Sequence, residues 1–280
     1  PDYAEAHYNL GNLLADFGQL EEAELSQRKA IKINPNYAIA YFSLSTLKYS
    51  KDDVKWQDKI FSEDILNNQS TKDKINIYFA RANILHKENN FKGSSKYLQL
   101  ANKLKLDMKP CNSKILIDSS KSLLIESDQK EFHKSEEKNT YPESIFIVGM
   151  PRSGSTLLES IISMNTFVYD LGEINILEES FLEGKKGNQA LTLAEEYWKK
   201  IKDLKKRSNI TTNKNLFNYQ YTGIIAKKIP NAKIIHCFRN PLDNILSIYR
   251  AHFSSGNEYS SSLIDCARVY LDQEEVMTEY

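Results

Sequence analysis

The stretch IFIVGMPRSGSTLLESII joins an apolar run to a helical pattern through a loop rich in Gly and Ser. Gly149 and Gly154 have the spacing of the phosphate-cradling loop of nucleotide triphosphatases, and Thr156 takes that loop's hydroxyl position. Ser155 stands where those proteins have lysine, so a triphosphate would lose its main side-chain contact. Arg152 supplies a cation earlier in the loop and can grip an anion through two hydrogen bonds. The loop therefore predicts an anion site that disfavours Mg-ATP.

A second anchor for an anion follows the run KIIHCF at residues 233–238, which has the composition of a buried strand. Asn240 can cap the helix that comes next, and Pro241 suits its first turn. Arg239 is thus expected at the carboxyl end of a strand, where open α/β sheets bind ligands. Ser247 lies further along the same helix.

The loop GMPRSGSTLLESII resembles the 5′-phosphosulfate loop of sulfotransferases, above all the branch with P-R-S-G-[ST]-T, which includes tyrosylprotein sulfotransferases. Those enzymes use 3′-phosphoadenosine 5′-phosphosulfate (PAPS) and need no metal. The resemblance implies that this loop holds the phosphosulfate, and that an arginine and a serine eight residues later hold the 3′-phosphate. The implied donor-binding residues are Arg152, Ser153, Gly154, Ser155, Thr156, Arg239 and Ser247.

The same resemblance nominates two groups for the chemistry. A Gly-Glu pair follows the predicted strand FVYDL, and its Glu173 corresponds to the family's catalytic base. Lys214, at the polar end of the predicted strand in NITTNKNLF, corresponds to the lysine beside the phosphosulfate, where it stabilises the leaving group together with Arg152. Neighbouring carboxylates compete for the role of base: Asp170, Glu178 and Glu179.

The first third of the chain carries an internal repeat. PDYAEAHYNL and PNYAIAYFSL align at an offset of 34 residues, which is the tetratricopeptide period. Small residues at Gly11 and Ala23 suit two closely packed helices, and Leu10 falls at a packing position. Such stacks leave a concave face for a peptide or partner domain, which Tyr8 and Tyr41 are candidates to line as exposed aromatics.

These patterns predict a multidomain protein, in which an all-α tetratricopeptide-type array of helical hairpins precedes an α/β, P-loop-like parallel-sheet domain of the sulfotransferase kind. We expect the repeats at residues 1–124, a charged linker at 125–142 and the sulfotransferase domain at 143–280. The chain starts in mid-pattern and ends within a helical pattern, without the Gly- and Lys-rich segment that completes the donor pocket in the family. We therefore expect a part of a longer protein, with its sulfotransferase domain incomplete at the C-terminus.

Composition excludes several classes of partner and site. Lys and Arg together number 37, as do Asp and Glu, so no basic excess favours nucleic acid. The apolar runs are far shorter than the roughly 20 residues that a membrane helix needs. Three scattered cysteines form neither a zinc motif nor a disulfide framework, and they favour a reducing, cytoplasmic location.

The predicted function is transfer of a sulfuryl group from PAPS to a hydroxyl acceptor, for which the closest branch suggests a protein tyrosine. The repeats would dock the acceptor or a protein partner. Two alternatives stay open from the sequence: a nucleotide-dependent kinase that uses the same loop, and a non-catalytic scaffold whose α/β domain only binds nucleotide.

Overall fold

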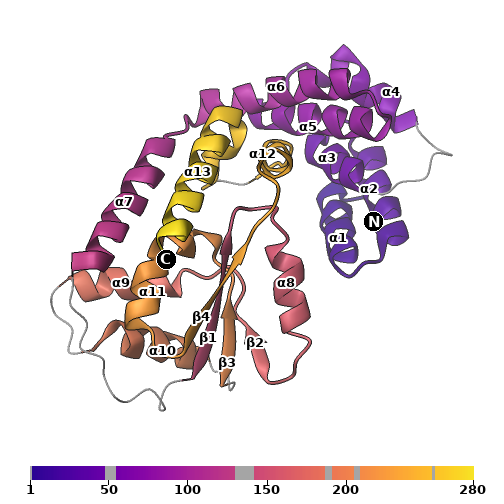
Figure 1. The fold of residues 1–280 in the computed structure, drawn as a ribbon. Helices are drawn as coiled ribbons and strands as arrows, with labels where there is room; N and C mark the ends of the chain where they lie inside the picture. Colours follow the sequence, from indigo (N-terminus) through magenta and orange to yellow (C-terminus); the bar gives the residue numbers. More distant parts are fainter. Residues whose placement is uncertain (1, 48–54, 130–141, 187–190, 205–208, 254–255) are drawn as a thin grey trace. The chain divides into compact units, whose positions relative to one another are not determined.

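The computed structural model describes residues 2–47, 55–129, 142–186, 191–204, 209–253 and 256–280 (Figure 1). They form two compact units. The repeat unit consists of residues 1–111 and 249–262, and the sheet unit consists of residues 112–248 and 263–280.

Helical hairpins make up most of the repeat unit. Their first helices begin at Ala4, Ala38 and Thr71, which is the predicted period for the first interval and one residue shorter for the second. In the first hairpin the two helices touch at Gly11, where an added Cβ would lie 2.6 Å from the Gln27 amide nitrogen. Ala23 is completely buried. The helices are α1 (Ala4–Asp16), α2 (Leu20–Ile33), α3 (Ala38–Thr46), α4 (Lys55–Phe61), α5 (Thr71–Lys87) and α6 (Phe91–Met108), with a 3₁₀ turn η1 at Glu63–Leu66.

Two packing predictions for the repeats are wrong. Tyr41 is fully buried: its ring lies 6.4 Å from that of Trp56, and its hydroxyl donates to the Pro35 carbonyl at 3.0 Å. Leu10, expected to pack, is 45% exposed. The helical period tells which residues share a face, but which neighbour covers that face depends on the stacking of distant helices.

Arg81 is the largest fully buried side chain of the repeat unit. Its guanidinium donates to the carbonyls of Ile60 (2.7 Å) and Ser62 (2.9 Å). It also lies 5.2 Å from the centre of the Tyr97 ring and 5.9 Å from that of Tyr78. Carbonyl acceptors and aromatic faces together offset the cost of removing the charge from water.

A segment distant in sequence completes the repeat unit. We call residues 249–253 and 256–262, which include the 3₁₀ turn η3 (Glu258–Ser261), the return segment. The ring of His252 stacks on Phe79 at 4.6 Å between centroids and lies 5.0 Å from Phe42, while its Nε2 is 3.1 Å from Asn76 Oδ1. The domain boundaries predicted from the sequence place these residues in the sulfotransferase domain, because long-range packing leaves no local pattern in a sequence.

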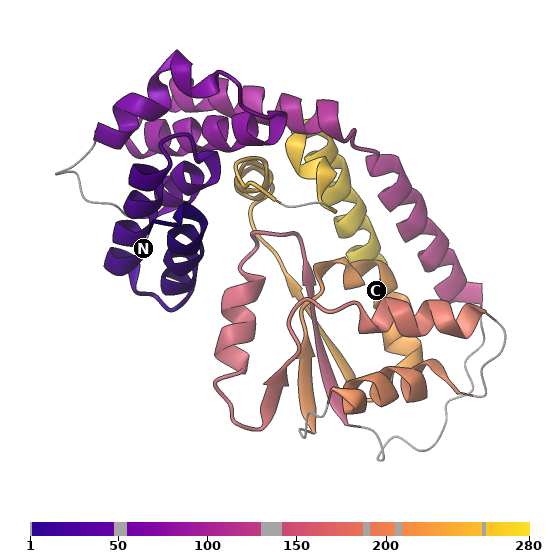
Figure 2. The same ribbon diagram turned by 180° about the vertical axis from the view of Figure 1, so that it is seen from behind.

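The sheet unit is built on four parallel strands in the order β2-β3-β1-β4. These are β1 (Glu143–Gly149), β2 (Val168–Asp170), β3 (Ile210–Asn213) and β4 (Ala232–Cys237). Figures 1 and 2 show α8 on one side of the sheet and α9, α10 and α11 on the other. All four strands run the same way, so the segments that follow them emerge at one edge.

The helices of the sheet unit bury both faces of the central strand. Phe146 and Val148 point into the main apolar core with Tyr197 and Trp198, whereas Ile147, also fully buried, points to the opposite face. The helices are α7 (Ser113–Gln129), α8 (Ser155–Ile162), α9 (Ile176–Lys185), α10 (Leu193–Asp203), α11 (Thr222–Lys228), α12 (Pro241–Tyr249, whose last residue belongs to the repeat unit) and α13 (Leu263–Glu279), with a 3₁₀ turn η2 at Leu216–Tyr221.

The structure differs from the sequence-based predictions in two further places. Helix α7 groups with the sheet unit and runs to Gln129, so it takes in the start of the predicted linker, and residues 130–141 of that linker lie outside the described residues. Strand β4 was predicted to be buried, yet five of its residues are half-buried and Lys233 is exposed. It pairs with β1 alone among the described strands, and a strand with one neighbour keeps a solvated edge.

Burial, with a smaller contribution from the Lys105 charge, lowers the pKa of His252 from 6.5 to about 4. We expect an NMR titration to show a midpoint near 4, with His252→Phe identifying the resonance and keeping the aromatic stack. As pH falls, His252 takes up its proton in the unfolded chain before it does so in the folded chain. The free energy of unfolding is therefore highest above pH 6.5 and decreases towards pH 4, by about 3 kcal/mol at most. A midpoint near 6.5 would contradict the burial of the ring between Phe42 and Phe79.

Candidate donor-binding site

The loop after β1 bends where glycine is required. Gly149 has φ +146°, and an added Cβ would lie 2.6 Å from the Cys237 carbonyl oxygen of the neighbouring strand. Gly154 has φ +100° and open space where a Cβ would stand, and it begins α8 without a side-chain cap. The backbone can therefore approach a ligand closely here, and an uncapped helix start offers N–H groups to an anion.

Arg152 lies in this loop with a left-handed backbone, at φ +68°. This conformation costs a residue other than glycine about 1–3 kcal/mol. It persists where surrounding contacts impose it, and it is frequent in ligand-binding loops. Its side chain is exposed and its Nε donates to Ser247 Oγ at a long 3.4 Å. This long bond holds the guanidinium weakly, so a ligand can compete for it.

Arg239 joins the two predicted anion anchors. It follows β4, and its Nη1 donates to the carbonyl oxygen of Arg152 at 3.0 Å. Arg152, Arg239 and Ser247 thus come together at the carboxyl edge of the sheet. The cap predicted for α12 is also confirmed, since Asn240 Oδ1 accepts from the backbone N–H groups of Leu242 (3.1 Å) and Asp243 (3.2 Å).

Two residues that hold this arrangement were missed by the sequence analysis. Asn244 is fully buried on α12 and donates from Nδ2 to the Pro151 carbonyl at 3.0 Å, which ties the loop to the helix. Tyr270 of α13 donates its hydroxyl proton to the Arg239 carbonyl at 3.0 Å. Asn244 lies one helical turn after the cap residue Asn240, a spacing that marks one helix face, whereas Tyr270 gave no local signal.

Lys214 and Glu173 form an ion pair, with 2.5 Å between Nζ and Oε1. The Lys214 side chain is 6% exposed and that of Glu173 is 66% exposed, so the carboxylate caps a nearly buried ammonium from the solvent side. The backbone fixes both residues, because the Lys214 N–H donates to the Gly172 carbonyl at 2.9 Å. A buried cation needs such a partner, and the structure brings together the two residues nominated for chemistry.

The competing carboxylates lie elsewhere around the edge of the sheet. Asp170, at the end of β2, is exposed. Glu178 and Glu179 are exposed in the first turn of α9, and Glu179 lies 3.7 Å from Lys200. A further carboxylate, Glu159 of α8, is buried and accepts from Thr212 Oγ1 at 2.9 Å.

The donor set around the loop fits an anionic ligand. The hydroxyl oxygen of Ser153 is buried and, within the described part of the chain, has no hydrogen-bond partner. The same loop carries the guanidinium of Arg152, accepts a hydrogen bond from that of Arg239 and leads into an uncapped helix start. Across the residues that the structure describes, no cluster of three or more His, Cys, Asp or Glu side chains is arranged to hold a metal ion.

Comparison with known proteins bears directly on this geometry. Residues 142–279 match the sequence profile described as the sulfotransferase family, and residues 4–37 match the tetratricopeptide repeat profile. The region of the candidate site is therefore similar to the sulfotransferase family, and the first hairpin is similar to a tetratricopeptide repeat. The match does not single out the tyrosylprotein branch.

One similar protein is an uncharacterised protein of Aquifex aeolicus (strain VF5), 25% identical over 271 residues. The match covers 88% of this chain and 35% of that relative, so the chain spans about a third of the relative's length. No solved structure matches the chain. Among the helices that the structure describes, none has both the length and the apolarity needed to cross a membrane.

We predict that Gly149→Ala destabilises the sheet unit by about 2–4 kcal/mol, because the new methyl group would force β1 and β4 apart at Cys237 in addition to straining the backbone. Gly172→Ala is the matched control: its φ is +65°, but the space is open, so only about 1 kcal/mol of strain is expected. Urea-induced unfolding measures both losses. If the two variants lost the same free energy of unfolding, the structure would accommodate the new methyl group beside Cys237 without cost.

Proposed function

We propose that this protein transfers a sulfuryl group from PAPS to a hydroxyl acceptor. The observation that supports the proposal best is the hydrogen bond from Arg239 to the backbone of Arg152, since it joins two cationic anchors at one edge of the sheet. A nucleotide with phosphate groups at both the 3′ and 5′ positions needs two such anchors. The loop of this spacing that binds ATP in nucleotide triphosphatases has a lysine at the position of Ser155.

The proposed roles combine the resemblance to sulfotransferases with the position of each group. Arg152 and the loop through Thr156 hold the 5′-phosphosulfate, and Arg239 and Ser247 hold the 3′-phosphate. When bound, the donor supplies a sulfuryl group already activated by its anhydride bond to phosphate. Lys214, nearly buried and cationic, stabilises negative charge that develops on the leaving phosphate oxygen.

Glu173 is the proposed general base. Its carboxylate is exposed to solvent, so an acceptor hydroxyl can reach it, and its backbone is held beside Lys214. The acceptor oxygen loses its proton to Glu173 and forms the new bond to sulfur, while the bond from sulfur to the phosphate oxygen breaks. The products are a sulfate ester and adenosine 3′,5′-bisphosphate.

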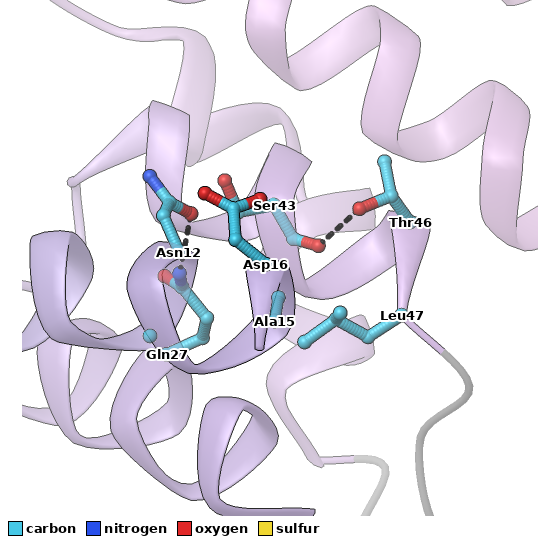
Figure 3. Close-up of a pocket in the computed structure, with 8 residues that line it drawn as sticks. Asn12, Ala15, Asp16, Gln27, Ser43, Thr46 and Leu47 are labelled. Atoms are coloured by element: carbon cyan, nitrogen blue, oxygen red, sulfur yellow. Dashed lines mark hydrogen bonds between the residues drawn. The ribbon is translucent and has the colours of Figure 1, made fainter. Parts of the chain in front are cut away.

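The repeat unit is proposed to dock the acceptor or a protein partner, by analogy with other tetratricopeptide stacks. A pocket of about 210 Å³ lies between α1 and α3 (Figure 3). Asn12 and Gln27, joined by a 2.9 Å hydrogen bond, line it, together with the carboxylate of Asp16. This lining favours a partner segment that donates hydrogen bonds. A protein tyrosine stays the acceptor class to test first, and a reducing compartment stays the expected location.

The donor class can be tested by calorimetric binding to the full chain without magnesium. We expect adenosine 3′,5′-bisphosphate to bind more tightly than ATP, and Arg239→Ala to weaken the bisphosphate by about 10- to 100-fold, the range for lost hydrogen bonds to a charged group. Lys233→Ala is the matched control, because this exposed cation pairs with Glu143 at the other end of β4. A preference for ATP would favour the kinase alternative instead.

The base can be tested by sulfuryl transfer in the full-length protein. Glu173→Gln is expected to lower the rate of transfer by about 10²- to 10⁴-fold, the usual contribution of a general base, with little change in bisphosphate affinity. Asp170→Asn is the control and should transfer at close to the wild-type rate. An unchanged rate in Glu173→Gln would remove that residue from the role, and a wild-type protein that transfers to no acceptor would favour the scaffold alternative.

A further inference from the structure

Within the sheet unit, helix α13 runs beside α7 in the same direction (Figures 1 and 2). Three serines of α7, spaced seven residues apart, each form a hydrogen bond with a residue of α13. The pairs are Ser113 with Asp265 at 2.6 Å, Ser120 with Asp272 at 2.7 Å, and Ser127 with Tyr280. Because seven residues make about two helical turns, these pairs stay on the facing sides of the two helices and fix their register.

Asp272 is the buried acceptor in the middle of this row. It is 5% exposed, and its Oδ2 accepts from the hydroxyl of Tyr219 at 2.8 Å as well as from Ser120. Gln220 donates from Nε2 to the same Ser120 hydroxyl at 2.8 Å. A buried carboxylate needs such donors in place of water. Helix α13 therefore cannot slide along α7 without leaving this carboxylate unsatisfied.

The opposite side of α13 faces β4 and the residue that follows it. Tyr270 is 4% exposed, and its hydroxyl donates to the Arg239 carbonyl at 3.0 Å. About one turn further along, Nε2 of Gln273 lies 2.9 Å from Nε2 of His236 on β4. Tyr270 and Asp272 are two residues apart, which places them about 200° apart around the helix. Side chains thus hold α13 from two opposite sides.

Tyr270 is bonded to the backbone of a proposed donor ligand. Arg239 lies between the end of β4 and Asn240, the cap of α12, and its side chain is exposed. Its carbonyl is held by Tyr270, while its Nη1 donates to the Arg152 carbonyl. A backbone that is fixed before binding reduces the conformational freedom that the guanidinium loses when it grips a phosphate. The hydroxyl of Tyr270 therefore acts on the donor site without reaching it.

We propose that α13 positions Arg239 for recognition of the 3′-phosphate. Tyr270 makes the contact with Arg239, and Asp272 keeps α13 in register with α7. Both are positioning residues, since each acts on the donor through another group. This inference rests on the proposed function, because it concerns the 3′-phosphate site of that function, and all the contacts that carry it lie within the sheet unit.

The test compares two nucleotides in the full chain by calorimetry: adenosine 3′,5′-bisphosphate, which has a 3′-phosphate, and AMP, which lacks it. Tyr270→Phe removes only the hydroxyl. It is expected to reduce the ratio of the bisphosphate affinity to the AMP affinity by about 3- to 10-fold, the range for one lost hydrogen bond. Tyr197→Phe is the matched control: it deletes another buried hydroxyl, bonded to Ser144 at 2.9 Å near the start of β1, and should leave the ratio unchanged.

A double variant tests whether Tyr270 acts through Arg239. Residues that act through one another have effects that do not add. The ratio in Tyr270→Phe combined with Arg239→Ala should therefore equal the ratio in Arg239→Ala alone. A further fall in the double variant would show another route from Tyr270 to the nucleotide and overturn the positioning of Arg239.

The part played by Asp272 has its own variants. Asp272→Ala should lower the ratio at least as far as Tyr270→Phe does. Asp272→Asn keeps an oxygen that can accept from Ser120 and Tyr219, and should restore most of the ratio. Should Asp272→Ala not fold, Ser120→Ala, which removes one of the two bonds to the carboxylate, takes its place. A folded variant with an unchanged ratio would remove the α7 contact from the proposal.

The remaining outcomes also decide. If Arg239→Ala lowers the ratio and Tyr270→Phe does not, the positioning role is overturned and the proposed function stands. A wild-type chain that binds both nucleotides equally contradicts the 3′-phosphate site, and with it both the proposed function and the positioning role. A ratio that falls equally in Tyr197→Phe means a general loss of stability in the sheet unit and overturns the specific role of Tyr270.

Discussion

Parallel pairing of β1 with β3 and β4 is the constraint on which the candidate site depends. Three strands that run the same way deliver three unrelated segments to one edge: the loop of Arg152, the Lys214 turn and the helix start after Arg239. An antiparallel neighbour would send its following residues to the opposite edge. The closeness of Gly149 to Cys237 is part of the same constraint, because glycine lets the loop leave the sheet without pushing β4 away.

The charged groups of the site form two kinds of arrangement: an ion pair and two exposed arginines. The pair of Lys214 and Glu173 is self-neutralising, and its cation is nearly buried. Arg152 and Arg239 are exposed; Arg152 donates to the hydroxyl of Ser247, and Arg239 donates to the carbonyl of Arg152. The solvated arginines would therefore meet a donor first, whereas the ammonium of Lys214 is compensated by Glu173 until that pair rearranges. Within the described residues neither arginine forms an ion pair, so an incoming anion would have none to break there, and rearrangement would be confined to Lys214 and Glu173.

The parts of the structure that could be predicted from the sequence are those marked by local sequence patterns. The strand, loop and helix at residues 145–162 were legible because apolar β-branched residues, glycine spacing and a helical period coincide there. The order of Lys214 and Arg239 along the chain placed them at strand ends. Burial of Tyr41, the half-solvated state of β4 and the membership of residues 249–262 were not predictable, because each depends on which distant element supplies a neighbour. Asn244 was missed since a buried amide looks like any polar helix residue until its carbonyl partner is known.

Arg81 has a consequence for how the hairpins respond to their surroundings. Its guanidinium is held by two main-chain carbonyls and by aromatic faces, with no carboxylate in the contacts described above. Dissolved ions screen attraction between opposite charges most effectively at exposed pairs, and they have little access to a cation enclosed in this way. Lysine would not substitute for it, since a single ammonium cannot reach both carbonyls in a fixed fork while lying flat against a ring. The contribution of Arg81 to the packing of α4, α5 and α6 should accordingly change little over the range of ionic strength in which surface ion pairs weaken.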